Sequence, residues 1–266
     1  MRYLSLYLEF YKIKLKGIVE YRSSFFLTSI SKFVNYLAHF ITIWIMINAF
    51  ETMGSWNAYE IMMLFSLQTA SYAIAGSFTY HITTYLSNWI KDGTFDEVLT
   101  KPLNPFLYLA SRLFSWGYFG TMTIALVVMI YCFVKLNITL SFIKVLFIIP
   151  VIIGGGLITG AMMIFASIPA FWIVENNFVA NLIFTVKDIT DYPITIFSKG
   201  LQILVTLIIP YAFVNFFPAQ FFLDKNDFSI FHPAFQFLTP VIGVIMFYLA
   251  YKLWMFGISH YKSTGS

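Results

Sequence analysis

The sequence has few charged residues. Only 11% of its 266 residues are Asp, Glu, Lys or Arg, whereas soluble domains carry roughly 25%. At the same time, 59% of the residues are hydrophobic and 20% are aromatic. A soluble fold of this size would need a charged shell over its apolar core, and this chain has too few charges to make one. The composition therefore indicates an integral membrane protein.

The sequence also lacks the motifs of common catalytic and metal sites. Its one cysteine, Cys132, excludes an intrachain disulfide, and its four histidines are scattered without ligand spacing. We find no glycine-rich phosphate loop, no Ser-centred nucleophile elbow and no pair of carboxylates placed for acid–base work. We therefore expect a protein that is not itself an enzyme, with no catalytic residue, cofactor, metal or nucleic-acid partner.

Long apolar runs are present instead. Five of them approach the ~20 residues needed to cross a ~30 Å hydrocarbon layer, at residues 25–50, 58–88, 113–135, 142–173 and 235–255. A less regular apolar region lies between residues 177 and 223. With one span assigned there, the sequence predicts six transmembrane helices. No short apolar stretch with a small-residue cleavage site begins the chain, so we expect no removable signal peptide.

Lysine and arginine are distributed unevenly around these runs. One side of the predicted bundle would carry both chain ends and the loop after the second run, with Arg2, Lys12, Lys14, Lys16, Arg22, Lys91, Lys101, Arg112, Lys252 and Lys262. The segments on the other side contain only three lysines, Lys135, Lys144 and Lys225. The positive-inside rule then places both termini and the loop 90–112 in the cytoplasm, for a multi-pass protein of the cell (inner) membrane.

Residues 3–22 precede the first run and have a helical period. One side of this helix is polar, with Ser5, Glu9, Lys12, Lys16 and Glu20. The opposite side is apolar, with Leu4, Leu8, Tyr11, Leu15 and Ile18. Such a helix lies in the membrane interface, where each lysine gains about 1 kcal/mol from anionic headgroups. We expect an interfacial anchor, or one that also contacts a cytosolic partner.

The segment IKDGTFDEVLTKPLNP, at residues 90–105, contains the signals of a short helix. Thr94 and Glu97 have the spacing of a capping box, in which each side chain accepts from a backbone amide of the first helical turn. Asp96 adds negative charge at the positive end of the same helix. The pattern predicts a helix that begins at Thr94.

The same segment also contains the signals that end this helix. Pro102 cannot continue it, and Asn104 followed by Pro105 predicts the cap and first residue of a second helix. The resulting helix, residues 94–101, would lie parallel to the membrane and expose Phe95, Val98 and Leu99. We expect these side chains to dock into a groove of a soluble partner; the alternative is a loop helix that rests on the bilayer.

Polar residues recur at helical spacing within the first two spans. Candidates for lining a substrate route between two subunits are Asn35, His39, Gln68, Tyr72 and Thr79. The alternative role for them is interhelical hydrogen bonding, at roughly 0.6 kcal/mol per bond. In the fourth span, glycines at 154–156 and 160 predict close helix packing.

Four segments, in this order, carry a resemblance to a known family. They are GTFDEVLTKPLNP (Gly93–Pro105), YPITIF (Tyr192–Phe197), IPYAFVNFFPA (Ile209–Ala219) and the C-terminal GISHYKSTGS (Gly257–Ser266). The chain resembles, over essentially its whole length, the six-span permease subunits of ATP-binding-cassette exporters with the type-2 export fold. The resemblance is to a long-uncharacterised bacterial and archaeal branch of these permeases.

The resemblance implies a permease subunit of an ATP-driven exporter for an amphipathic or hydrophobic substrate. It makes residues 3–22 a connecting helix and residues 94–101 a coupling helix, both in contact with a separate ATPase chain. Two permease subunits, identical or paralogous, would pair over two ATPases. The coupling residues would be Thr94, Phe95, Asp96, Glu97, Val98 and Leu99. The alternative function is a non-transporting membrane sensor or assembly scaffold whose loop docks a different cytosolic protein.

Two topologies are open for the region between the fourth and the last span. Hydropathy alone makes residues 201–222 the fifth span and leaves 175–200 as a cytosolic loop. The resemblance implies a fifth span at about 178–198, followed by residues 200–222 as a re-entrant hairpin, and we prefer this version. It places Lys187 and Asp188 near membrane depth, where a charge costs a few kcal/mol unless it is paired or faces a water-filled cavity. We therefore expect these two residues to pair or to line the pathway.

The predicted fold is thus an all-α integral membrane protein with a single permease domain over residues 1–266. It has an N-terminal interfacial helix, six transmembrane helices and a re-entrant hairpin between the fifth and the sixth.

Overall fold

The computed structural model describes residues 2–20, 22–50, 52–139, 141–173 and 177–262. These residues form helices joined by short turns, with one small β-hairpin made of β1 (Thr52–Met53) and β2 (Trp56–Asn57). The helices are α1 (Arg2–Glu20), α2 (Arg22–Phe50), α3 (Ala58–Lys91), α4 (Phe95–Leu99), α5 (Pro105–Arg112), α6 (Phe119–Lys135), α7 (Phe142–Ser167), α8 (Asn177–Ile189), α9 (Lys199–Ile203), α10 (Phe216–Leu223) and α11 (Thr239–His260). The prediction of an all-α fold is confirmed apart from this hairpin.

Within the described part of the chain, four helical segments are long and apolar enough to cross a membrane. They are α3, α6 with the preceding turn Trp116–Tyr118, α7 with the following turn Ile168–Phe171, and α11. They coincide with the second, third, fourth and sixth predicted spans. The first predicted span is α2, whose 29 residues exceed the length needed. The fifth corresponds to α8, which has only 13 residues, so the count of six spans stays a prediction.

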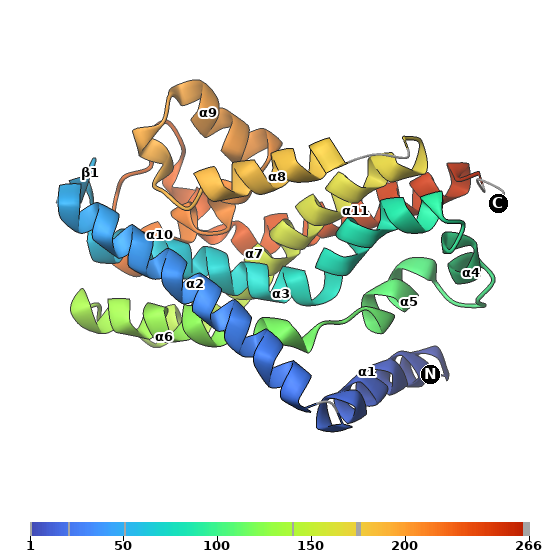
Figure 1. Cartoon of the computed structure of the whole chain (residues 1–266). Helices are drawn as coiled ribbons and strands as arrows, with labels where there is room; N and C mark the ends of the chain where they lie inside the picture. Colours follow the sequence, from blue (N-terminus) through green and yellow to red (C-terminus); the bar gives the residue numbers. More distant parts are fainter. Residues whose placement is uncertain (1, 21, 51, 140, 174–176, 263–266) are drawn as a thin grey trace.

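The helices run between two ends of an elongated bundle (Figure 1). Figure 1 shows α1, α4, α5 and both chain ends toward one end, and β1, α9 and α10 toward the other. We call these the terminal end and the hairpin end. The basic loop after α3 therefore lies at the same end as both termini, as the distribution of lysine and arginine predicts.

Helix α7 packs closely against both α3 and α11, and its glycines permit this approach. A Cβ added at Gly154 would lie 2.7 Å from the Cα of Pro240 in α11, and one at Gly156 would lie 2.8 Å from the Cβ of Ile74 in α3. Real Cβ atoms do not come so close, so a larger residue would force the helices apart. At Gly160 the nearest atoms would be 3.5 Å away. The prediction of close helix packing is therefore confirmed at Gly154 and Gly156. At Gly160 there is room for a Cβ atom, so the packing does not require a glycine there.

Helix α1, the predicted interfacial helix, lies against α5 instead of standing alone. The Phe10 ring contacts the Tyr108 ring edge to face, with centroids 5.5 Å apart, and the Ser111 hydroxyl donates to the Tyr11 hydroxyl at 3.4 Å. On the outer side of α1, the hydrogen bond from Lys12 at 2.6 Å lowers the pKa of Glu9. These contacts tie α1 to the segment that follows α4.

The run at residues 199–223 is broken in its middle. Helix α9 continues into a π-helical turn (Leu204–Ile208), and α10 follows after Pro210 at an angle of 77° between the two halves. Pro210 has no amide hydrogen for a helical bond, which accounts for the break. The two flanks of the run meet: the Thr195 hydroxyl donates to Asp227 Oδ2 at 3.1 Å. The chain therefore enters and leaves this segment at one place.

Candidate functional site

Helix α4 does not present the face that the sequence predicts. Phe95 is fully buried and Val98 is 5% exposed, so the expectation that both side chains are exposed is wrong. Phe95 makes edge-to-face contacts with Phe171, after α7, and with Trp254, in α11, at centroid distances of 5.7 and 6.3 Å. Burial against these aromatic rings removes both side chains from water. Of the three predicted residues, only Leu99 is exposed, at 36%.

The predicted capping box at Thr94 and Glu97 is absent. Thr94 already has helical angles, φ −69° and ψ −16°, and its side chain caps no backbone amide. Its hydroxyl donates back to the Trp89 carbonyl oxygen of α3 at 3.4 Å. Helix α4 accordingly covers only Phe95–Leu99, shorter than the predicted 94–101. The physical reason is that Gly93, at φ +71°, turns the chain so that α4 begins directly after α3.

Glu97 takes part in ion pairs at the surface instead. Its Oε1 lies 3.5 Å from Lys101 Nζ and 3.9 Å from Arg112 Nη1, and the three side chains are between 40% and 59% exposed. Exposed pairs of this kind contribute at most about 1 kcal/mol. The carboxylate is therefore held near two cations and stays accessible from outside.

The turn between α4 and α5 has the cap that the sequence predicts. Asn104 Oδ1 accepts from the Leu107 amide at 3.1 Å, and Pro105 occupies the first position of α5. The Asn104 amide also donates to the Tyr251 hydroxyl of α11 at 2.8 Å. The turn from α4 to α5 is thus fixed by a cap and by a bond to the last helix.

Helices α4 and α5 and the end of α3 enclose a surface cavity of about 430 Å³. We call it the coupling cavity. Its lining combines apolar and charged side chains, with Trp89, Asp92, Thr94, Glu97, Val98, Leu109, Arg112 and Leu113. Leu99 and Leu107, 36% and 46% exposed, are apolar side chains of the same two helices. This surface could receive a protein partner through both apolar and charged contacts.

A second cavity, of about 230 Å³, lies between α2, α3 and the end of α8. Five of the seven predicted pathway residues line it: Asn35, His39, Tyr72, Lys187 and Asp188. Its other lining residues are Tyr36, Phe65, Phe184 and Asp191. We call it the polar cavity. Residues from sequence positions more than 150 apart are therefore brought together around one space.

Two of the charged residues of the polar cavity, Lys187 and Asp188, form an ion pair. Lys187 Nζ lies 2.7 Å from Asp188 Oδ1 and 5.6 Å from the centroid of the Tyr72 ring. Pairing of Lys187 with Asp188 is one of the two arrangements that the sequence allows. Asp191, two residues after α8, lines the same cavity: it is 9% exposed, and its buried Oδ1 has no hydrogen-bond partner among the described residues.

Gln68 and Thr79 do not line the polar cavity. Gln68 is 1% exposed, and neither side-chain polar atom has a hydrogen-bond partner in the described part of the chain. The Thr79 hydroxyl donates to the Ala75 carbonyl oxygen of its own helix at 2.7 Å and lies 3.3 Å from the sulfur of Met163. Thr79 therefore contacts a neighbouring helix through its hydroxyl, which is the alternative to lining a substrate route.

The hairpin end is held by a cluster of polar contacts that the sequence analysis did not find. Asp227 Oδ2 accepts from the Ser55 hydroxyl and the Trp56 indole, each at 2.8 Å, in addition to Thr195. Lys225 Nζ lies 2.8 Å from Glu60 Oε2 and donates to the Ser55 carbonyl oxygen at 2.6 Å. We call this cluster the outer clasp; its residues are Ser55, Trp56, Glu60, Thr195, Lys225 and Asp227. The available signal was Asn57 followed by Glu60, which form a capping box at the start of α3.

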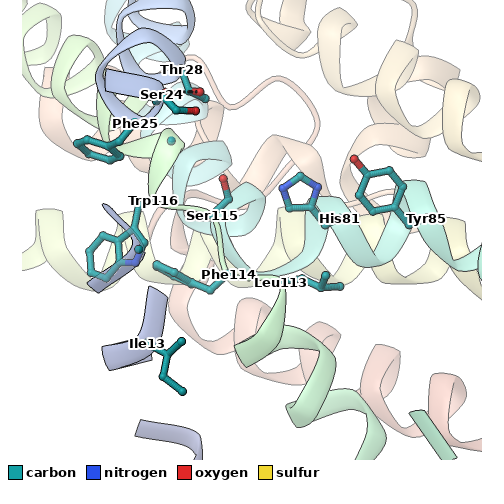
Figure 2. A pocket seen from close by; sticks show the side chains of 12 residues that line it. Ile13, Ser24, Phe25, Thr28, His81, Tyr85, Leu113, Phe114, Ser115 and Trp116 are labelled. Atoms are coloured by element: carbon teal, nitrogen blue, oxygen red, sulfur yellow. Dashed lines mark hydrogen bonds between the residues drawn. The ribbon is translucent and has the colours of Figure 1, made fainter. Parts of the chain in front are cut away.

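The largest of the described cavities, of about 650 Å³, opens where α1 and α2 meet α3 and the connector 113–117. Figure 2 shows the rings of His81 and Tyr85 next to each other on one side of it and Phe114 and Trp116 on another. None of the predicted site residues lines it. Among the described residues, no group of three or more His, Cys, Asp or Glu could hold a metal ion.

The bundle contains long apolar helices that could cross a membrane, which is the architecture of a multi-pass membrane protein. The family model described as ABC-2 family transporter protein matches residues 33–265. The chain belongs to this family, whose members are typically the non-catalytic membrane component that works with an ATPase component. No curated protein and no solved structure matches the chain.

Proposed function

We propose that the chain is the permease subunit of an ATP-driven exporter, coupled to a separate ATPase through α1, α4 and α5. Two permease subunits would form the substrate pathway over two ATPase subunits, with membrane lipid around them. Both termini and the coupling cavity would face the cytoplasm at the cell (inner) membrane. The substrate would be an amphipathic or hydrophobic molecule moved outward by alternating access.

The position of α4 is the observation that carries this proposal. On its buried side, Phe95 packs against the ends of α7 and α11. On its exposed side, Glu97 lines the coupling cavity, and Leu99 of α4 and Leu107 of α5 are exposed apolar side chains. A protein bound at this surface would therefore act on the ends of α7 and α11. Thr94, Asp96 and Glu97 would contribute to docking from the exposed part, and Phe95 and Val98 would transmit the force.

The polar cavity supports a pathway role for its lining residues. Asn35 and His39 are exposed on α2, and Asp188 is exposed on α8. Such residues are costly on a lipid-facing surface and are favourable beside a water-filled space or a second subunit. We propose that this space is part of the substrate route.

The re-entrant topology of residues 200–222 belongs to the same proposal. In support of it, Thr195 and Asp227 lie in contact on either side of the segment, and the two halves are bent by 77°. In addition, the Asn215 amide donates to the Thr190 carbonyl oxygen at 2.6 Å. A broken helix at membrane depth needs such internal partners for its backbone and side chains.

Co-purification tests the proposal. The permease is co-expressed with each candidate cassette ATPase of its source organism, and Leu99→Asp is compared with the unchanged chain. A charge at this exposed position should release the ATPase without preventing membrane insertion. Ile230→Asp, 48% exposed in the loop between α10 and α11, is the matched control and should keep the ATPase. Retention of the ATPase at full stoichiometry in Leu99→Asp would show that α4 is not the coupling element.

The alternative, a sensor or assembly scaffold, predicts a different result in the same preparation. A scaffold would bring down another cytosolic protein at the same surface, and no cassette ATPase would be present. Reconstitution with the ATPase and measurement of ATP hydrolysis then separates a coupled transporter from a passive assembly.

A further inference from the structure

The polar cavity carries an unbalanced negative charge. Its lining contains one lysine, Lys187, and two aspartates, Asp188 and Asp191. The lysine is engaged by Asp188 at 2.7 Å. Asp191, although more than nine-tenths buried, has no hydrogen bond to its Oδ1 from any described residue. Lys187 also attracts the Asp191 carboxylate, so one lysine is shared by two carboxylates. A buried carboxylate oxygen without a hydrogen bond is unfavourable, so this arrangement favours the arrival of a further cation or donor from outside the chain.

The walls of the cavity are aromatic. The rings of Tyr36 and Tyr72 lie 6.1 Å apart, and His39 lies 6.2 Å from both Tyr36 and Phe65. Phe184 of α8 lines the same space. Aromatic faces attract organic cations through their negative π-electron surface, and the attraction is stronger where water is excluded. Carboxylate and ring faces together are the recognition chemistry of an organic ammonium group.

Lys187 itself demonstrates this chemistry in the site. Its ammonium group lies 2.7 Å from Asp188 Oδ1 and 5.6 Å from the centroid of the Tyr72 ring. Asp191 supplies a second carboxylate in the same cavity without a second cation. The volume, about 230 Å³, is smaller than the pocket of a whole drug-sized ligand, roughly 300–1,000 Å³. It suits a cationic head group whose apolar remainder extends beyond the cavity.

We propose that the polar cavity binds the ammonium head group of a cationic amphipathic substrate, with Asp191 as its counter-ion and Tyr36, Tyr72, Phe65 and Phe184 as its aromatic walls. This inference rests on the proposed permease function and specifies the class of molecule transported. Lys187 then sets the charge of the site: it limits the negative potential that attracts the substrate.

Equilibrium binding of a small probe tests the proposal. The probe is tritiated benzyltrimethylammonium, measured on the permease–ATPase complex in nanodiscs with empty nanodiscs subtracted. Neopentylbenzene, the neutral molecule in which carbon replaces the charged nitrogen, is the competitor of matched shape. Saturable binding of the ammonium that neopentylbenzene does not displace is expected. Equal displacement by the neutral molecule, or no saturable binding, would overturn the proposal.

Two substitutions with opposite predicted effects distinguish charge recognition from a structural role. Asp191→Asn removes the negative charge of this carboxylate at constant shape and should weaken binding by about tenfold or more. Lys187→Gln leaves two unopposed carboxylates and should strengthen binding. If Asp191 and Lys187 only stabilised the fold of the cavity, both variants would bind the ammonium more weakly. Weaker binding in both variants would therefore contradict the proposal. Glu9→Gln, the same loss of one negative charge on exposed α1, should leave binding unchanged.

Failure of this inference and failure of the permease function give different results. If the ATPase co-purifies and Asp191→Asn binds the ammonium as the unchanged chain does, the substrate class is wrong and the permease function stands. If no cassette ATPase binds the chain, the permease function fails whatever the probe does.

Discussion

The Thr195 hydroxyl donates to the Asp227 carboxylate at 3.1 Å, across 32 positions of sequence. This bond closes the loop that contains α9 and α10 and joins it to the outer clasp. Because both residues lie at the hairpin end of the bundle, the intervening segment returns to the place where it started. A continuous fifth span over residues 201–222 would carry its two ends to opposite sides of the membrane.

Labelling from outside the cell tests this topology. Lys199→Cys, in a chain with the buried Cys132 replaced by alanine, should react with a membrane-impermeant maleimide on intact cells. Lys91→Cys, exposed at the end of α3, is the control and should react only after the membrane is opened. Labelling of position 199 only in opened cells would make 201–222 the fifth span and would return Lys187 and Asp188 to the cytosol.

The outer clasp should contribute measurably to stability. Asp227→Asn keeps the shape of the side chain but loses the charge of the carboxylate that accepts from Ser55, Trp56 and Thr195. Hydrogen bonds to a charged group contribute about 1.5–3 kcal/mol each, so the free energy of unfolding should fall by about 2 kcal/mol or more. Thermal unfolding of the purified protein in detergent measures this loss. Asp92→Asn, exposed beside α4, should change stability by less than about 0.5 kcal/mol.

The two apolar positions of α4 should respond differently to truncation. Phe95→Ala empties a fully buried site between aromatic rings and should cost about 3–5 kcal/mol of unfolding free energy. Leu99→Ala changes an exposed side chain and should cost little in the isolated chain. The comparison is made by thermal unfolding without the ATPase. Equal losses at both positions would contradict the assignment of Phe95 to the inner face.

The caps of the two short helices provide another matched pair. Asn104 accepts from the Leu107 amide and Thr94 caps no amide. Asn104→Ala should therefore cost about 0.5–2 kcal/mol, the usual loss of a helix cap, and Thr94→Ala should cost clearly less. Thermal unfolding measures both. A larger loss for Thr94→Ala would mean that its hydroxyl has a structural role beyond its bond to Trp89.

Much of the fold follows from local patterns in the sequence. Runs of apolar residues locate α2, α3, α6, α7 and α11, because length and hydropathy alone decide whether a helix crosses a bilayer. The cap at Asn104 was also predictable, since it depends on neighbouring residues. The pairing of Lys187 with Asp188 follows from the cost of a lone charge at membrane depth.

Contacts between distant parts of the chain could not be predicted in this way. The sequence shows that Phe95 and Val98 are apolar, but not that Phe171 and Trp254 return to cover them. Asp191 carries no local motif and gains its place only because α2, α3 and α8 meet there. In the same way, the Thr94 pattern fits a cap, but the turn at Gly93 directs its hydroxyl back to α3.

The packing of Phe95 against Phe171 and Trp254 has a mechanical consequence. A coupling helix that stood free in the cytosol could swing while the membrane helices stayed still. Here α4 is wedged between the terminal ends of α7 and α11, and these two helices are in turn interlocked through Gly154 and Pro240. If α4 couples to an ATPase as proposed, a displacement of α4 would reach the ends of α7 and α11 through the Phe95 ring.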